Sequence, residues 1–176
     1  MRLCKSPECR KITFRSSFLP RLRQEGVHRV MSSELSRARE SASLIANKLK
    51  KRFYPDARVN EISFGSWEGK TGREIMRSKD QAYLKWCRGK FVTPSDGESL
   101  RNFKQRTKFF LNDVFRRHRG KTVLVATHGG TIRMFLCHLL KLPLQDFWTF
   151  QISPGSLTKV QIFSGHVLVD YLNFRP

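Results

Sequence analysis

Residues 121–127 (KTVLVAT) restrict the fold of this chain more than any other stretch. The run is continuously apolar and rich in β-branched residues, as expected of a strand that is buried on both faces of a parallel sheet. A His-Gly-Gly triplet follows at 128–130, and residues 131–142 are typical of an apolar helix that Pro143 ends. A buried strand that turns directly into a helix is characteristic of α/β proteins, so the sequence predicts an α/β fold.

The rest of the chain alternates between strand and helix patterns, which favours a mostly parallel sheet. Ser32 and Ser33 are candidate N-caps for a helix over residues 35–53. Other strands or extended segments are expected at 27–31, 57–62, 157–163 and 166–172, and other helices at 19–25, 71–77, 81–88 and 99–117. Gly165 lies between the last two strands, which predicts a hairpin there.

Charge is the unusual property of the composition. Lys and Arg number 34 against 14 Asp and Glu, which leaves a net charge of +20. Such a chain attracts nucleic acid, anionic membranes and phosphorylated metabolites alike. The densest basic run, residues 116–121, is interpreted as a solvated helix end or as a patch for nucleic-acid phosphates. No nucleic-acid-binding signature accompanies it, so we favour the helix end and expect nucleic-acid binding to be non-specific only.

Length and cysteine usage are those of an ordinary globular protein. The 176 residues suit one domain, and 39% hydrophobic residues suffice for a core. Cys4 and Cys9 could form half of a zinc knuckle, but no second pair has zinc spacing, so we expect reduced thiols and neither a metal nor another cofactor. No signal peptide or membrane-spanning stretch is recognisable, which favours a cytoplasmic protein without a membrane partner.

Reactive side chains occur where predicted strands end and helices begin. Ser33 and Arg37 open the helix that follows the strand at 27–31. Unpaired backbone N–H groups, the helix dipole and a guanidinium fork favour a phosphate at such a place. At the end of the buried strand, the imidazole of His128 can donate to a phosphoryl group, and Gly129 lets the backbone approach a ligand.

An acidic candidate lies between these two segments. Glu61, just before the loop FGSWEG, is placed to protonate a leaving oxygen, and Glu68 in the same loop competes for that role. Each candidate has an ordinary structural alternative. Arg37 could be a surface arginine paired with a neighbouring glutamate, His128 a half-buried histidine bonded to a carbonyl, and Glu61 an exposed strand end.

The order of these motifs resembles one known family. The runs SSELSRARESA, NEISFGSWEG, PSDGESLRNFKQR and VLVATHGGTIRMFLCHLL follow one another as in the histidine phosphatase superfamily, in its phosphoglycerate-mutase-like branch. The resemblance extends from residue 19 to about residue 163. Within this branch, FGSWEGKTGREI and the Gly-Glu-Ser turn look most like the α-ribazole phosphatase subfamily of cobalamin synthesis.

The resemblance implies a three-layer α/β/α sandwich and metal-independent hydrolysis of a small phosphorylated metabolite through a phosphohistidine. By matching positions, Arg37 corresponds to the arginine that grips the phosphoryl group, Glu61 to the proton donor, and His128 to the second histidine, which stabilises the transferring group. Fixed donors for the phosphoryl oxygens and a proton for the leaving alkoxide are what this chemistry needs.

One part of the family pattern is missing. The family begins with a strand that ends in Arg-His-Gly, whose histidine is the nucleophile, and no such triplet occurs among these 176 residues. The five histidines are His28, His118, His128, His138 and His166. Sequence that resembles the family starts at Leu19. We therefore predict an atypical segment over 1–18 and a histidine-phosphatase-like domain over 19–176 that lacks its first strand.

Several explanations of this loss stay open. The chain is a truncated or frame-shifted reading of a normal gene, which we favour because the pattern changes abruptly at Leu19, or a degenerate member that binds phosphorylated ligands without turnover. Residues 12–14 could also replace the lost strand, although little room remains for the helix that should follow. In each of the first two cases we expect little or no activity. A nucleic-acid-binding protein on a borrowed fold is the remaining alternative.

Overall fold

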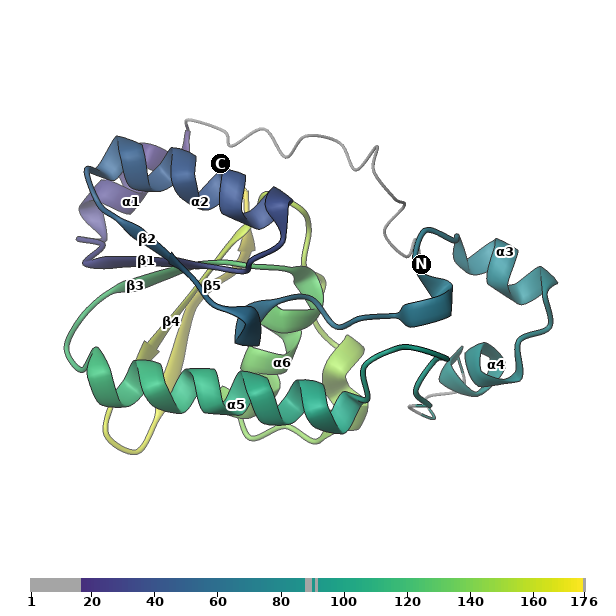
Figure 1. Cartoon of the computed structure of the whole chain (residues 1–176). Helices are drawn as coiled ribbons and strands as arrows, with labels where there is room; N and C mark the ends of the chain where they lie inside the picture. Colours follow the sequence, from purple (N-terminus) through teal and green to yellow (C-terminus); the bar gives the residue numbers. More distant parts are fainter. Residues whose placement is uncertain (1–16, 88–89, 91, 176) are drawn as a thin grey trace. The chain divides into compact units, whose positions relative to one another are not determined.

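The structure, a computed structural model, describes residues 17–87, 90 and 92–175 (Figure 1). The chain divides into two compact units, a larger one of residues 17–61 and 107–175 and a smaller one of residues 62–106. The predicted strand at 12–14 and the cysteines Cys4 and Cys9 lie outside the described residues. The predicted domain boundary between residues 18 and 19 lies at their edge and stays a prediction.

Parallel strands form the sheet of the larger unit. They are β1 (Arg29–Ser32), β2 (Phe53–Pro55) and β3 (Val123–Ala126), in the order β2-β1-β3. Val30 of β1 stands opposite Phe53 on one side and Leu124 on the other. The connections run through helices, as parallel neighbours require, and the predicted α/β class with its mostly parallel sheet is confirmed.

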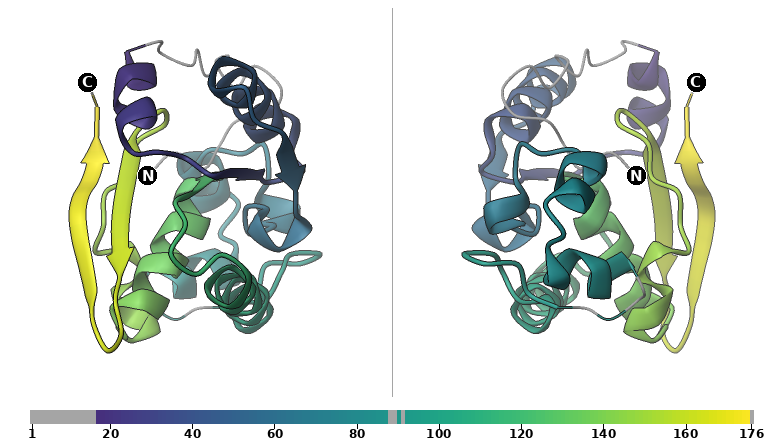
Figure 2. Two further views of the ribbon diagram at one scale, coloured as in Figure 1. Left: turned by 90° about the vertical axis from the view of Figure 1, so that its left-hand side faces the viewer. Right: turned by 90° about the vertical axis from the view of Figure 1, so that its right-hand side faces the viewer.

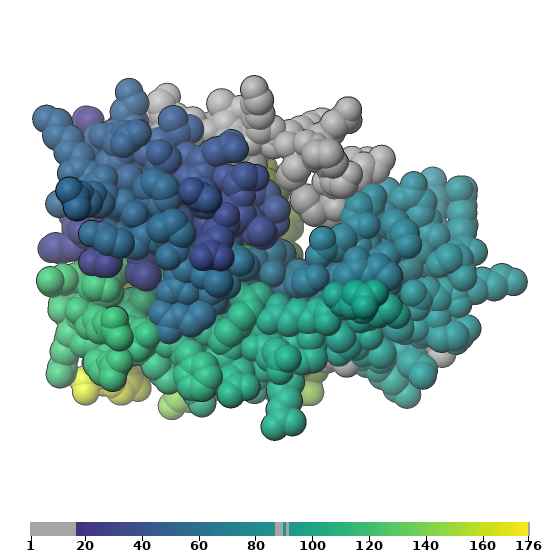
Figure 3. Space-filling model, viewed as in Figure 1, coloured from purple at the N-terminus to yellow at the C-terminus, as the bar shows by residue number. Residues whose placement is uncertain are grey.

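Helices cover both faces of this sheet (Figure 1). One face carries α1 (Phe18–Gln24) and α2 (Ser36–Leu49), and the other carries α6 (Gly129–Leu139) and the turns of α5 (Leu100–Arg117) from Thr107 onward. Because side chains alternate along a strand, Val30 belongs to the core under α1 and α2, whereas Met31 packs against the core under α5 and α6. This is the predicted α/β/α sandwich, and Figure 3 shows its surface over α2 and α5.

A separate antiparallel hairpin completes the larger unit (Figure 2). It consists of β4 (Leu157–Ile162) and β5 (Val167–Phe174), and Gly165 takes the positive φ of 93° that the turn requires. Among the described residues, β3 pairs with β1 only, so its other edge has no strand partner. All of its residues are half-buried, although the apolar run predicts a strand buried on both sides.

Two predictions around α2 are wrong in detail. The helix ends at Leu49 rather than at residue 53, because Lys50 takes the left-handed conformation and Phe53 pairs into the sheet. Neither Ser32 nor Ser33 is the N-cap, which is Leu35.

The segment expected to be extended at 57–62 begins instead with a 3-10 turn, η1 (Ala57–Val59), because the carboxylate of Asp56 accepts the N–H of Arg58.

The smaller unit is held by aromatic packing. It contains the 3-10 turn η2 (Gly65–Trp67) and the helices α3 (Gly72–Arg77) and α4 (Gln81–Cys87). The buried Trp67 meets Tyr83 and Trp86 edge to face at centroid distances of 5.2 and 5.8 Å. Its indole N–H donates to Asp80 over 2.9 Å, so a tryptophan anchors α4 and the residue before it.

Further properties of the described residues bear on the site. No helix among them is long and apolar enough to cross a bilayer. They hold no group of three His, Cys, Asp or Glu side chains arranged for a metal ion. The predicted cytoplasmic location stays a prediction.

Candidate functional site

The candidate site forms where β1 and β3 end. Ser33 directly follows β1, and its backbone N–H donates to Ala126, the last residue of β3, over 2.9 Å. His128 is the N-cap of α6, two residues beyond β3. Both side chains are buried, so the parallel pairing of β1 with β3 brings together two polar residues that are 95 positions apart in sequence.

The hydroxyl of Ser33 organises this corner. Its Oγ lies 2.8 Å from Nε2 of His128 and 2.8 Å from Oδ1 of Asn60, and it accepts the N–H of Leu35 over 3.1 Å. Asn60 Oδ1 can only accept, so the single hydroxyl proton goes to it. The imidazole must therefore donate from Nε2 to Ser33. These contacts fix both the orientation of the His128 ring and the nitrogen that carries its proton.

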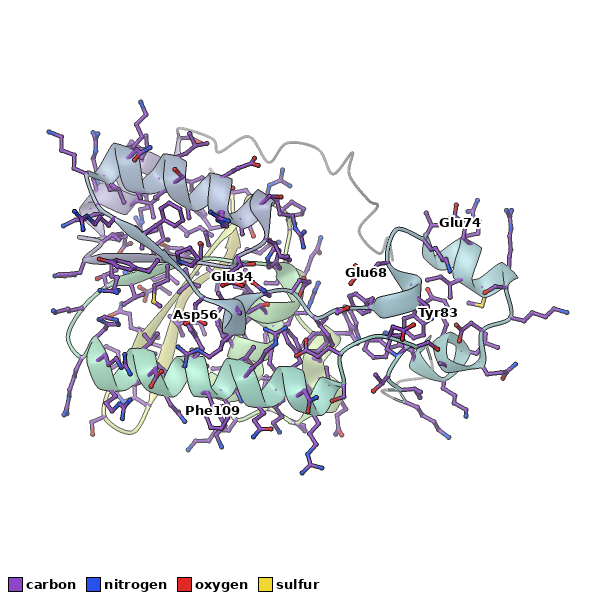
Figure 4. All side chains as sticks on the ribbon, in the orientation of Figure 1. Glu34, Asp56, Glu68, Glu74, Tyr83 and Phe109 are labelled. Carbon is purple, nitrogen blue, oxygen red and sulfur yellow. The ribbon has the colours of Figure 1, made fainter. Side chains whose placement is uncertain are left out.

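Asn60 is a contributor that the sequence did not single out. Its Oδ1 accepts from the Ser33 hydroxyl and from the backbone N–H of Glu34 over 2.8 Å (Glu34 is labelled in Figure 4). Its carbonyl accepts the hydroxyl of Thr131 on α6 over 3.0 Å. Asn60 thus joins the turn into α2 to the start of α6. Its position directly before Glu61 is the only sequence signal for it.

Glu61 belongs to the same corner. Its carboxylate accepts the backbone N–H of Gly130, in the first turn of α6, over 3.0 Å. A Cβ atom at Gly130 would collide with this carboxylate, so a glycine at position 130 lets the carboxylate take the place it has. The competing candidate Glu68 lies in the smaller unit, where it accepts from Ser63 and from the N–H of Phe64.

Arg133 is a second residue that sequence reasoning missed. Its Nε donates to the carbonyl of Phe150 over 2.8 Å, and its guanidinium lies 5.1 Å from the ring centre of Trp148. Burial lowers the pKa of Arg133, and the negative charge of Glu61 works against this lowering. Arg133 follows Gly129 by four positions, which places both on one face of α6; this helical spacing could have revealed it.

Arg37 lies in the first turn of α2, four positions beyond Ser33, and its side chain is half-buried. The ion pairs of the described residues do not include it, so the predicted pairing with a neighbouring glutamate is not formed there. Arg39, on the same helix, is exposed. The role of Arg37 as a phosphate clamp stays a prediction.

Together these elements define a class of site. Two helices begin at the carboxyl edge of a parallel sheet, and a histidine, a carboxylic acid and two arginines belong to this end of the larger unit. Helix starts and guanidinium groups bind anions, and an acid beside them can transfer a proton. The arrangement is that of an α/β protein with an anion-binding edge and a neighbouring proton donor.

The chain belongs to the histidine phosphatase superfamily (branch 1), whose family model matches residues 16–175. It is 27% identical over 157 residues to an adenosylcobalamin/alpha-ribazole phosphatase of Salmonella typhimurium, which covers 88% of this chain and 77% of the relative. It is 30% identical over 153 residues to phosphoserine phosphatase 1 of Hydrogenobacter thermophilus, covering 86% and 72%.

A solved structure agrees with this assignment. The crystal structure of the alpha-ribazole phosphatase from Shigella flexneri superposes with a TM-score of 0.74 at 25% identity, over 83% of this chain and 73% of that one. The predicted family is therefore confirmed, and membership of it makes the protein a phosphatase by family.

Proposed function

We propose that this protein is a phosphomonoester hydrolase domain that binds a small phosphorylated metabolite at the carboxyl edge of β1 and β3. The observation that carries the proposal is the hydrogen-bonded connection from His128 through Ser33 to Asn60, next to Glu61. It joins, in one corner, residues from three separate sequence motifs. A histidine with a purely structural role would need only one hydrogen-bond acceptor. It would not need hydrogen bonds that also involve the start of a helix and lie next to an acid.

Each residue has a role in this proposal. Arg37 and the N-terminus of α2 hold the phosphoryl oxygens, and Gly129 lets the start of α6 approach them. His128, oriented by Ser33, donates to the phosphoryl group from Nδ1 when its ring is protonated, because its Nε2–H is given to Ser33. Glu61 delivers the proton that the leaving alkoxide needs.

The substrate we favour is α-ribazole phosphate. Support comes from the loop FGSWEGKTGREI and from the relatives whose names carry that activity. Phosphoserine is the main competitor, because a relative of similar identity is named for it. Both are monoesters of small polar alcohols, so the same phosphoryl site serves either one.

The nucleophile is the part of the mechanism that these 176 residues do not supply. No Arg-His-Gly triplet occurs in them, and His128 serves the second histidine's role. We therefore expect the chain as given to hold phosphate without appreciable turnover. Without the phosphate contacts of the Arg-His-Gly strand, the affinity should be millimolar or weaker, which is about 4 kcal/mol or less.

Activity assays test this expectation. Hydrolysis of p-nitrophenyl phosphate, α-ribazole phosphate and phosphoserine should be near the uncatalysed rate for the 176-residue chain. A graft of a strand that ends in Arg-His-Gly, after the family pattern, in front of Leu19 should produce turnover, whereas the same graft with its histidine changed to alanine should not. Robust turnover by the 176-residue chain alone would contradict the expectation that it is inactive.

Binding can be measured without turnover. Inorganic phosphate should shift the ring signals of His128 in NMR spectra, and Arg37→Ala should weaken this titration several-fold because a charge-assisted contact is lost. Arg39→Ala, an equal loss of charge on an exposed residue of the same helix, is the matched control. If both variants titrate like the parent chain, the phosphate site lies elsewhere.

A further inference from the structure

A cavity of about 440 Å³ opens in the larger unit, at the end of the sheet opposite to the candidate phosphate site. It lies where β1, β2 and β3 begin, whereas Ser33 and His128 follow the ends of β1 and β3. The length of β1 alone separates the two places by about 13 Å at the rise of a strand. We call this place the basic cavity.

Cations dominate its lining. Six of the lining side chains are permanently charged: Arg29, Lys50, Lys51, Arg52, Arg117 and Lys121. No carboxylate from the described part of the chain lines the cavity. The ion pairs in that part engage other cations: Arg21, Arg58, Arg106, Arg116 and Lys159. Within the described residues, the positive charge of the basic cavity is therefore not compensated by ion pairs.

Helix dipoles explain only part of this cluster. Lys50 and Arg117 stand at the C-terminal ends of α2 and α5, where a cation is favourable by itself. Lys51, Arg52 and Lys121 lie beyond the helices, in the connections to β2 and β3, and gain nothing comparable. Their convergence on one cavity requires another reason.

Arg29 adds an unsatisfied donor. Its Nε is buried and has no hydrogen-bond partner in the described residues, and its guanidinium lies 3.7 Å from the ring centre of Tyr54, another lining residue. The aromatic contact holds the guanidinium in place. A buried N–H without an acceptor is unfavourable, and an oxygen of a bound anion would satisfy it.

Two histidines also line the cavity. Nδ1 of His28 accepts the N–H of Thr122 over 3.1 Å, so its neutral ring carries the proton on Nε2. The pKa of His118 is lowered by burial first, and then by the charges of Arg29, Lys121 and Arg117.

We propose that the basic cavity binds a small molecule that carries two or more phosphate groups. Six cations carry more positive charge than a single phosphate would neutralise. The volume lies in the usual range of small-ligand sites. The proposed phosphatase site takes a monoester at the other end of the sheet, so the two proposals stand or fall separately.

Histidine NMR with inorganic triphosphate as the probe tests this proposal at physiological salt. Triphosphate should shift the ring signals of His118 and His28, and it should bind at least tenfold more tightly than orthophosphate. Because a bound anion favours the imidazolium form, the pKa of His118 should rise on binding. The ring signals of His128 should not shift at the triphosphate concentrations that shift those of His118.

A charge-matched pair of variants separates a site from general attraction. Lys50→Gly with Lys121→Gln removes two lining cations, and glycine suits the positive φ of 54° at position 50, so the fold should be kept. Triphosphate affinity should fall at least tenfold. Lys48→Gln with Lys108→Gln, both exposed and outside the cavity, removes the same charge and should change it less than twofold.

Three outcomes would overturn the proposal. The first is an equal loss of affinity in both double variants, which would leave only net charge. The second is a triphosphate titration that leaves His118 unmoved. The third is tight binding of a short DNA duplex. If the duplex binds as tightly as triphosphate and depends equally on Lys50 and Lys121, the cavity is part of a nucleic-acid-binding surface.

Discussion

At the scale of the residue, the hydroxyl of Ser33 is fully used. It donates to Asn60 and accepts from His128 and from the backbone of Leu35, so every hydrogen-bonding position of the oxygen is occupied. Buried groups connected in this way are expensive to disconnect, because each lost partner leaves a donor without an acceptor in a place that water reaches poorly. The orientation of His128 therefore depends on a residue outside its own motif.

Ser33→Ala should expose this dependence. The change leaves the donors of His128 and Leu35 without their acceptor, and we expect the free energy of unfolding to fall by about 1–3 kcal/mol. Phosphate affinity should fall with it. Denaturant unfolding measures the first effect and the His128 titration the second. Ser41→Ala is the control, since Ser41 bonds only to a carbonyl of its own helix; an equal loss there would contradict the argument.

Adjacent glycines give a second prediction. Gly130→Ala should be destabilising by about 1–3 kcal/mol, because its Cβ would collide with the carboxylate of Glu61 and push the acid from its place. Gly129→Ala should be neutral or mildly stabilising, because its Cβ meets nothing closer than 3.4 Å and alanine favours the helix. Thermal unfolding of both variants decides it. Equal melting temperatures would mean that Glu61 moves freely.

At the scale of the element, the sequence predicted most of the architecture and half of the site. Strand-to-helix turns are local, so the pattern placed Ser33 and His128 at neighbouring strand ends. It extended the first long helix to Phe53 because Pro55 is the helix breaker that follows, but Phe53 pairs with Val30 in the sheet instead. Asn60 and Arg133 were missed because neither stands directly at a strand-to-helix turn, where the pattern indicates a site.

A charge network ties η1 to α5. Arg58 bonds to Asp56, which follows β2 and is labelled in Figure 4, and to Asp113 on α5, each over 2.7 Å. Burial by itself raises the pKa of Asp56, but the hydrogen bonds from Arg58 outweigh it and leave the pKa lowered. The hydrogen bond from Arg58 likewise lowers the pKa of Asp113.

The lowered pKa values predict a pH dependence. Stability from lowered carboxylate pKa values is fully present above the unfolded value of about 4 and is lost as pH falls through the folded values. Arg58→Met should therefore lower the melting temperature at pH 7, and the difference should shrink below about pH 3. Arg116→Met, with a side chain 72% exposed, should have little effect. A difference independent of pH would point to packing of Arg58 on Phe110 instead.

At the scale of the whole molecule, a net charge of +20 on 176 residues sets the response to salt. Repulsion among like charges opposes the compact state, and added salt screens it. The melting temperature should rise as NaCl increases from about 10 to 100 mM, over which the Debye length falls from about 30 to 10 Å. A melting temperature that falls over this range would show that attractive pairs outweigh the repulsion.

The half-buried edge of β3 favours association between copies of the chain, which the repulsion opposes. An apolar strand with one unpaired edge is a template on which another extended chain can add, and the described residues offer it no cover by a strand. At low salt, repulsion between the net positive charges keeps copies of the chain apart, so the unpaired edge of β3 does not meet another chain. Screening removes that barrier, so light scattering of a concentrated solution should grow with salt even while each molecule becomes harder to melt. Conformational and colloidal stability are thus expected to move in opposite directions in this protein.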